Sequence, residues 1–79
     1  MGNILKLHEA IAVVLLNKPD RTASEQEIAY EINSRRLYTR RDGKDLPAYQ
    51  VMQRTKLAGG RYHYLFDYQP SNKIALRNI

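Results

Sequence analysis

Four polar side chains between residues 49 and 54 have the types and spacing of a helix face that reads base pairs. The amides of Gln50 and Gln53 can each pair with adenine, and the guanidinium of Arg54 can bind guanine or a phosphate. Tyr49 can donate a hydrogen bond or lie against a thymine methyl group. The same side chains also suit the solvated face of any surface helix, which is the alternative interpretation. We predict that these four residues read base edges.

Cationic side chains flank this segment on both sides. Such groups bind the sugar-phosphate backbone and position a protein without reading sequence. The predicted phosphate-binding residues are Arg40, Arg41, Lys44, Lys56, Arg61, His63, Lys73 and Arg77. An ordinary solvated surface charge is the alternative for each of them. Arg35 and Arg36 are weaker candidates, because the end of a helix already explains a cation there.

The charge of the chain is divided unevenly along its length. The net charge is +5, with −2 over residues 1–34 and +7 over residues 35–79. Nucleic acid is a common partner of such a basic half, because neutralising phosphates releases counterions. A basic surface that only keeps the domain soluble is the alternative.

Residue patterns typical of enzymes are weak in this chain. Asp20 and the Asp-Gly-Lys stretch at 42–44 superficially match a metal-dependent nuclease, but that chemistry needs both acids to converge on one metal from adjacent strands. Here one acid follows a helix and the other lies in a turn. The two histidines, His8 and His63, lack ligand spacing, and the chain has no cysteine. We expect a non-enzyme with no catalytic residue, no metal and no cofactor.

The spacing of apolar residues predicts the elements that position these groups. Leu7, Ile11, Val14 and Leu15 form one stripe of an expected helix over 4–17. Ser24 and Glu27 have the spacing of a capping box at the start of an expected helix over 24–36. The other expected elements are a short strand over 21–23, a polar connection over 38–46 with a turn at 42–43, a helix over 47–57 stopped by glycines 59 and 60, and strands over 62–68 and 73–77 joined by a loop over 69–72.

The third expected helix has two distinct sides. At 100° per residue the inner side holds Ala48, Val51, Met52 and Thr55. The outer side carries Tyr49, Gln50, Gln53 and Lys56, with Arg54 at the flank. Among the tyrosines of the hairpin, Tyr62, Tyr64 and Tyr68 could stack on unpaired bases. The favoured alternative is that some of these rings are buried under the sheet.

This order of elements predicts one α+β domain, mainly α, over residues 1–79. Its form is a winged helix-turn-helix: a three-helix core, a short strand and a two-stranded wing. The longest apolar run, Ile11 to Leu16, is far shorter than the ~20 residues that span a bilayer. We therefore expect no membrane contact and a cytoplasmic protein, nucleoid-associated if bacterial.

Several short stretches, in this order and spacing, resemble the HARE-type helix-turn-helix family over about residues 5–77. They are Glu27-Ile28-Ala29, Ile32-Asn33, Leu37-Tyr38, Arg40-Arg41-Asp42-Gly43, Gln50-Val51 with Arg54, Leu65-Phe66 and Lys73-Ile74-Ala75-Leu76. Members of that family are winged helices fused to restriction endonucleases, to other DNA-modifying enzymes, to an RNA polymerase subunit and to chromatin proteins. The segment 57–64 is longer and richer in glycine than the family's usual link, which leaves the length of the third helix open.

The resemblance implies a double-stranded DNA-binding module of a restriction or transcription system, with possible sensitivity to base modification. The expected partners are double-stranded DNA and a fused or associated nuclease, methyltransferase or polymerase subunit. The alternative is a winged helix that docks on a polymerase or enzyme subunit through protein contacts.

Overall fold

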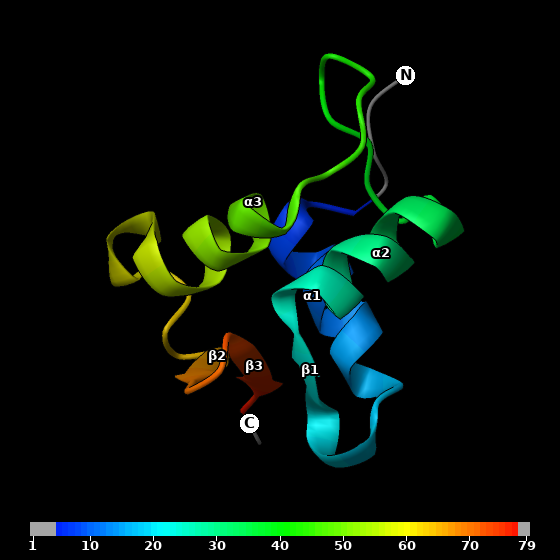
Figure 1. Ribbon diagram of the computed structural model, residues 1–79. Coiled ribbons are helices and arrows are strands. Elements are labelled where there is room, and N and C mark those ends of the chain that lie inside the picture. The colour runs from blue at the N-terminus through cyan, green and yellow to red at the C-terminus, as the bar shows by residue number, and fades with distance from the viewer. Residues whose placement is uncertain (1–4, 78–79) are drawn as a thin grey trace.

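The fold is α+β and about half helical, with three helices and one three-stranded sheet, as a computed structural model describing residues 5–77 shows. The helices are α1 (Leu7–Leu16), α2 (Glu25–Arg35) and α3 (Ala48–Met52), and the strands are β1 (Thr22–Ser24), β2 (Phe66–Gln69) and β3 (Lys73–Leu76). The predicted α+β class and the order of its elements are confirmed at this level. Figure 1 shows the loop between α2 and α3 at the top of the molecule and the sheet at the bottom.

The sheet is antiparallel in the order β1-β3-β2, so β3 is the central strand. Thr22 pairs with Ala75 on one side, and Phe66 pairs with Leu76 on the other. We call β2 and β3 the hairpin. Both hairpin strands are shorter than predicted. The first begins only at Phe66, because residues 62–65 form turns in which the Tyr62 carbonyl accepts hydrogen bonds from the Leu65 and Phe66 amides.

One apolar core joins the helices to the sheet. The predicted stripe of α1 is buried, as are the inner residues of α2 and the centre of β3. The fully buried large side chains include Ile11, Val14, Leu15, Ile28, Ile32, Val51, Phe66 and Ile74. Each such burial contributes about 1.5–3 kcal/mol relative to exposure, so these side chains fix how the helices pack.

The starts of the first two helices are set by side-chain caps. The Ser24 hydroxyl accepts a hydrogen bond from the Glu27 amide at 3.1 Å, as predicted. The reciprocal half of the predicted capping box is replaced, since the Glu27 carboxylate binds the Lys18 ammonium at 2.8 Å. α1 begins at Leu7 and not at residue 4, which lies outside the described residues, and the Glu9 carboxylate accepts from the amide of residue 6 at 2.7 Å.

The predicted third helix over 47–57 is wrong in its regularity and its length. α3 ends at Met52 and continues as a π-helical turn, Gln53–Leu57, and a 3-10 turn, Ala58–Gly60. We call residues 48–60 the third helical segment. The Thr55 hydroxyl donates to the Val51 carbonyl at 2.9 Å, a local bond that competes with the helix ladder and bends helices. Gly59, with φ at 64°, ends the segment in the predicted place.

The connecting loop, residues 37–47, is held at both ends. Arg36 adopts the left-handed conformation, with φ at 54°, and turns the chain away from α2. The predicted turn is confirmed, since the Gly43 amide donates to the Arg40 carbonyl at 3.0 Å. At the far end, Asn33 of α2 donates to the Leu46 carbonyl at 3.0 Å and accepts from the Leu46 amide at 2.8 Å. This double hydrogen bond fixes the point at which the third helical segment starts.

Within the described part of the chain, no helix combines the length and the apolar character needed to cross a bilayer.

Candidate nucleic-acid interface

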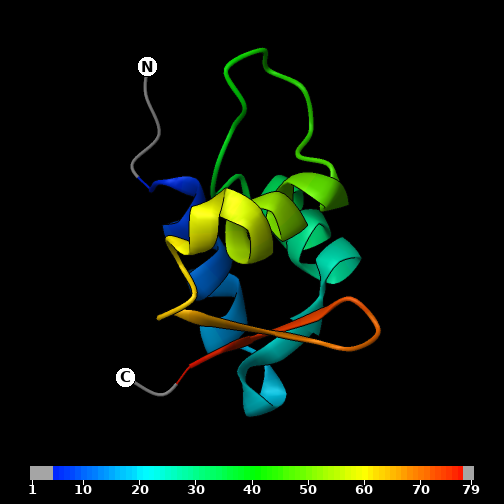
Figure 2. The same ribbon diagram turned by 90° about the vertical axis from the view of Figure 1, so that its left-hand side faces the viewer.

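The third helical segment lies between the connecting loop and the hairpin. In Figure 2 the loop is above the segment, the hairpin is below it, and all three border the side that faces the viewer. The loop carries three of the predicted phosphate-binding cations and the segment carries all four predicted base-reading side chains. The fold therefore brings both predicted sets to neighbouring elements.

The predicted inner and outer sides of the third helical segment are confirmed in part, since the predicted inner residues Ala48 and Met52 are no more buried than the predicted outer residue Gln50. Val51 and Thr55 are buried, whereas Tyr49 is 54% exposed. Gln53 and Lys56 are also exposed, while the side chains of residues 48, 50, 52 and 54 are half-buried. The outer row of this segment is thus free to contact a ligand.

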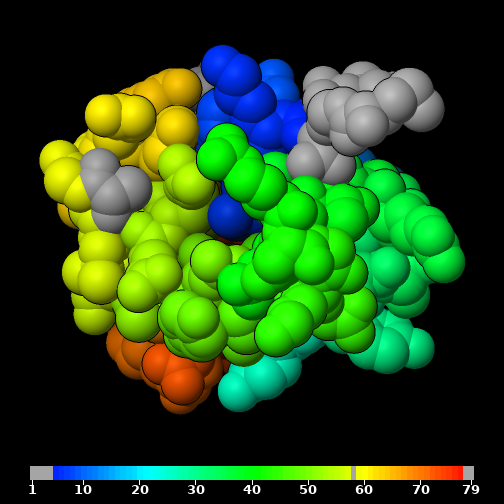
Figure 3. Space-filling model, turned by 90° about the horizontal axis from the view of Figure 1, so that it is seen from above, coloured from blue at the N-terminus to red at the C-terminus, as the bar shows by residue number. Residues whose placement is uncertain are grey.

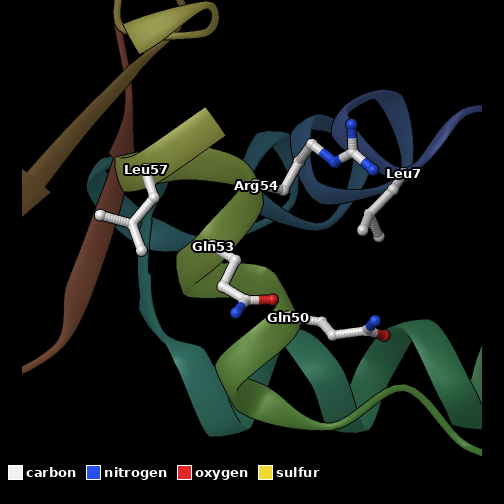
Figure 4. Close-up of a pocket in the computed structure, with 5 residues that line it drawn as sticks. All are labelled: Leu7, Gln50, Gln53, Arg54 and Leu57. Atoms are coloured by element: carbon white, nitrogen blue, oxygen red, sulfur yellow. The ribbon is translucent and has the colours of Figure 1, made fainter. Parts of the chain in front are cut away.

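A hollow of about 330 Å³ opens along one flank of the third helical segment. It is lined by Gln50, Gln53, Arg54 and Leu57 together with Leu7 of α1. Figure 4 shows the Arg54 guanidinium extending from the segment toward the Leu7 side of this hollow. Three of the four predicted base-reading residues consequently share one concave surface.

Two further hollows adjoin the first, because all three share Leu7 and Arg54. One, of about 420 Å³, adds Tyr38, Arg40 and Arg41 of the connecting loop, with Asp42 beside them. The other, of about 320 Å³, is lined in addition by Leu5, Lys6, His8, Tyr38 and Tyr62. We call the three together the trough. Figure 3 shows it between the green loop and the yellow-green helical segment, with blue atoms of the N-terminal part at its bottom.

The aromatic wall of the trough is ordered by stacking. The rings of His8 and Tyr62 are 4.4 Å apart at an interplanar angle of 21°. The Arg54 guanidinium carbon lies 5.9 Å from the centre of the Tyr62 ring, within the range of a cation–π contact. The Arg54 guanidinium is therefore held beside an aromatic ring, and both groups line the same hollow.

The connecting loop places its cations differently. Arg40 forms an ion pair with Asp42 at 2.9 Å, which partly neutralises it, whereas Arg41 is exposed at the edge of the trough. The Lys44 amide donates to the Asp42 carboxylate at 3.0 Å, and Lys44 itself lines a separate hollow with Arg36. The trough thus gathers two of the three loop cations.

The other predicted phosphate-binding residues lie toward the hairpin. The Lys56 ammonium is 4.7 Å above the Tyr68 ring, and the Lys56 carbonyl is 2.7 Å from His63 Nε2, which must carry a proton to donate to it. Arg77 donates from Nε to the His63 carbonyl at 2.7 Å and lies 3.8 Å from the Asp67 carboxylate. These three residues stabilise the junction between the helical segment and the hairpin, and Lys56 and Arg77 also add positive charge to its surface.

Two predicted cations lie apart from the trough. Arg61 is exposed in the turn after the third helical segment. Lys73 is exposed on β3 and lines a hollow with Asp20 and Glu27, so acidic groups surround it. The positive charge of residues 35–79 is therefore spread over the fold, with a net charge of +1 in the connecting loop, +2 in the third helical segment and +2 over residues 61–77.

A buried carboxylate ties the hairpin to α2. Glu25 is 8% exposed and accepts a short hydrogen bond from the Tyr68 hydroxyl. Burial, together with this bond, raises the pKa of Tyr68 to about 12.

On the outer side of α2, the hydrogen bonds of Lys18 to Glu27 and Glu31 raise the pKa of that lysine. The hydrogen bond between Lys18 and Glu27 also lowers the pKa of Glu27.

No pattern in the sequence indicated that four further residues line a common surface with the third helical segment, namely Lys6, His8, Tyr38 and Tyr62. Lys6 belongs to the acidic half of the chain, and Leu7 was predicted only as a core residue. Lys6 and His8 share a hollow with Arg54 although more than forty residues of sequence separate them from it, whereas Tyr38 and Tyr62 lie 16 and 8 residues from Arg54. Contacts between elements that are distant in sequence leave no periodic pattern of residues along the chain, so the sequence does not predict them.

The groups of the nuclease-like pattern lie in different parts of the fold. Asp20 is in the turn before β1 and Asp42 is in the connecting loop. Among the residues that the structure describes, no group of three or more histidine, aspartate, glutamate or cysteine side chains could hold a metal ion.

Comparisons of the chain with protein-family models, with curated proteins and with solved structures find no match.

Proposed function

We propose that this chain is a winged helix-turn-helix module that binds double-stranded DNA and performs no catalysis. The observation that carries the proposal is the meeting of Gln50, Gln53 and Arg54 with Arg41 around one concave surface beside an exposed helix. A major groove, about 12 Å wide, admits one α-helix, and amide and guanidinium groups pair with base edges there. The order of helices, strands and hairpin supports the winged-helix form.

In this proposal the third helical segment enters the major groove with Tyr49 and Gln53 outermost. Arg41 and Lys44 of the connecting loop bind phosphates on one flank, and Lys56 binds them on the other. The proposal also adopts the HARE-type resemblance, in which such a module serves a nuclease, a methyltransferase or a polymerase subunit.

The test is a titration of the pure chain with a random-sequence duplex at several salt concentrations. With about five phosphate contacts, log K should fall with log salt at a slope near −4 to −5. A slope near zero, or no binding at low salt, would overturn the proposal.

A matched pair of glutamine variants tests the role of the third helical segment. Gln53→Ala should reduce the ratio of affinities between a selected and a scrambled duplex by about 5- to 100-fold, because a bidentate pair contributes ~1–3 kcal/mol of discrimination. Gln26→Ala, at an exposed glutamine of α2, should leave that ratio unchanged. Equal effects of the two variants would show that another surface reads the DNA.

The second candidate is a module that docks on a polymerase or enzyme subunit. Two exposed hydrophobic side chains favour it: Leu16, at the end of α1, is 56% exposed, and Tyr30 of α2 is 72% exposed. Large exposed apolar groups are typical of protein interfaces when they form a patch. The absence of any salt-dependent DNA binding would favour this candidate.

A further inference from the structure

The trough combines three kinds of surface, and insertion of a helix into the major groove of a paired duplex does not require this combination. Its bottom is apolar, formed by Leu7 and bordered by Leu57. One wall is aromatic, with Tyr38 and the stacked Tyr62. Guanidinium and amide groups from Arg54 and Gln50 project along it. Phosphates alone would need only the cations.

We propose that the trough binds one unpaired nucleobase of the DNA held by the third helical segment. The inference rests on the proposed function, because the segment that reads the duplex forms one wall of the trough. An extruded or unpaired nucleotide of the same duplex would lie next to this opening.

The dimensions of the trough suit a small planar ligand. Its largest hollow measures about 420 Å³, near the lower end of the range of ~300–1,000 Å³ that small-molecule pockets occupy. Apolar side chains at the bottom replace the stacking neighbours that a base loses when it leaves the duplex. The Gln50 amide lies where it can pair with a base edge, and the Arg54 plane can stack on the ring.

The charged rim matches the sugar-phosphate that accompanies such a base. Arg41 lies at the loop side of the trough and Lys6 at the α1 side. Asp42 is engaged by Arg40, which reduces its repulsion of a phosphate. A cation on each side can therefore bind the phosphates that precede and follow the unpaired nucleotide.

An acidic peptide with leucine side chains would match the same apolar bottom and cationic rim. The flat surfaces favour the base: His8 and Arg54 already engage the Tyr62 ring, so a base would stack on the Arg54 guanidinium or on the Tyr38 ring, which line the same hollow. Stacking on such surfaces is sequence-tolerant because every base has a π-face.

The experiment compares three oligonucleotides of equal strand length by fluorescence anisotropy with the full chain. One is fully paired, one carries a single bulged adenine, and one carries an abasic residue at the bulge. The abasic duplex has the same flexibility without the base. We expect the bulged adenine to bind about 10-fold more tightly than the abasic bulge, as one stacked base contributes.

Two tyrosine variants assign this preference to the trough. Tyr38→Leu keeps an apolar side chain against the core but removes the ring, and it should abolish the preference. Tyr30→Leu, at a tyrosine of α2 that is 72% exposed and does not line the trough, should retain it. Lys6→Ala, at an exposed side chain, is the second trough variant and should weaken all bulged duplexes without unfolding the chain.

The outcomes separate the two proposals. If paired and bulged duplexes bind but the base gives no advantage over the abasic bulge, the trough proposal is overturned and the proposed function stands. If single-stranded oligonucleotides bind with Tyr38 dependence while paired duplex does not, the proposed function fails, and the trough proposal is overturned in its present form because no duplex is held beside the base. If only a synthetic glutamate–leucine peptide binds in a Tyr38-dependent way, the trough is a protein site and the proposal is overturned. Binding of none of these probes overturns both proposals.

Discussion

Asn33 holds the connecting loop in place through two hydrogen bonds to Leu46, and its loss has a calculable effect. The bonds measure 3.0 and 2.8 Å, and Leu46 is only 3% exposed. Each bond contributes ~1 kcal/mol net, and its removal leaves a shielded backbone group unpaired. Asn33→Ala should therefore destabilise the domain by about 2 kcal/mol. For a domain of this size that corresponds to a fall in Tm of ~8–16 °C.

Thermal unfolding followed by circular dichroism measures this effect, with Asn17→Ala as the matched control. Asn17 donates one hydrogen bond to the Val13 carbonyl at 3.3 Å in an exposed position, so its loss should change stability by less than ~0.5 kcal/mol. Asn33→Ala should also weaken duplex binding, because the loop end that starts α3 is released. If the two variants melt within about 2 °C of each other, which corresponds to at most ~0.5 kcal/mol, the loop is held by other contacts and the reasoning is wrong.

Three further predictions concern single residues. Arg36→Gly should stabilise the domain by about 0.5–1 kcal/mol in a urea titration, because a glycine adopts the left-handed conformation without strain. Arg35→Gly, at the last residue of α2, should destabilise the domain by ~1 kcal/mol in the same titration. Burial raises the pKa of Tyr68 from 10.0 to about 12. The stability that its neutral phenol contributes is therefore complete below pH 10.0 and is lost as the pH rises through about 12. One tyrosine should ionise late in an ultraviolet absorbance titration, and Tyr68→Phe should remove that late step. The hydrogen bond from Lys18 lowers the pKa of Glu27. The stability from this pair is therefore present above the ordinary carboxyl pKa of 4.5 and is lost as the pH falls through the lower folded-state pKa. Lys18→Met should flatten this part of the plot of urea midpoint against pH, and an unaltered plot would contradict the pairing.

The parts of the fold that the sequence predicted well are those decided by burial of apolar area. The stripe from Leu7 to Leu15 and the inner residues Ile28 and Ile32 recur at helical spacing, and all of them are buried. Because hydrophobic burial is the largest favourable term in folding, its periodicity shows directly in the order of residues. The turn at Gly43 was predictable for a similar reason, since a positive φ restricts the residue type.

The parts that the sequence missed depend on local competition or on distant contacts. The third helix was expected to be regular, but the Thr55 hydroxyl bonds within the helix and the segment widens into a π-helical turn. The first hairpin strand was expected from Tyr62, whose ring instead stacks on His8 of α1 and lies with residues 63–65 in turns. Such contacts outweigh strand propensity, which is a weak and context-dependent preference. The trough is the extreme case, because its walls come from four separate stretches of sequence.

Tyr68 connects three elements at once: its hydroxyl binds Glu25 at the start of α2, its own strand belongs to the hairpin, and its ring lies under Lys56 at the end of the third helical segment. Detachment of any one of these elements breaks at least one contact of this side chain. The amide protons of the hairpin should then exchange with solvent at the same free energy of opening as those of α2, in one cooperative unit. In the proposed DNA complex, this coupling would transmit a phosphate contact at the surface of the hairpin to the third helical segment.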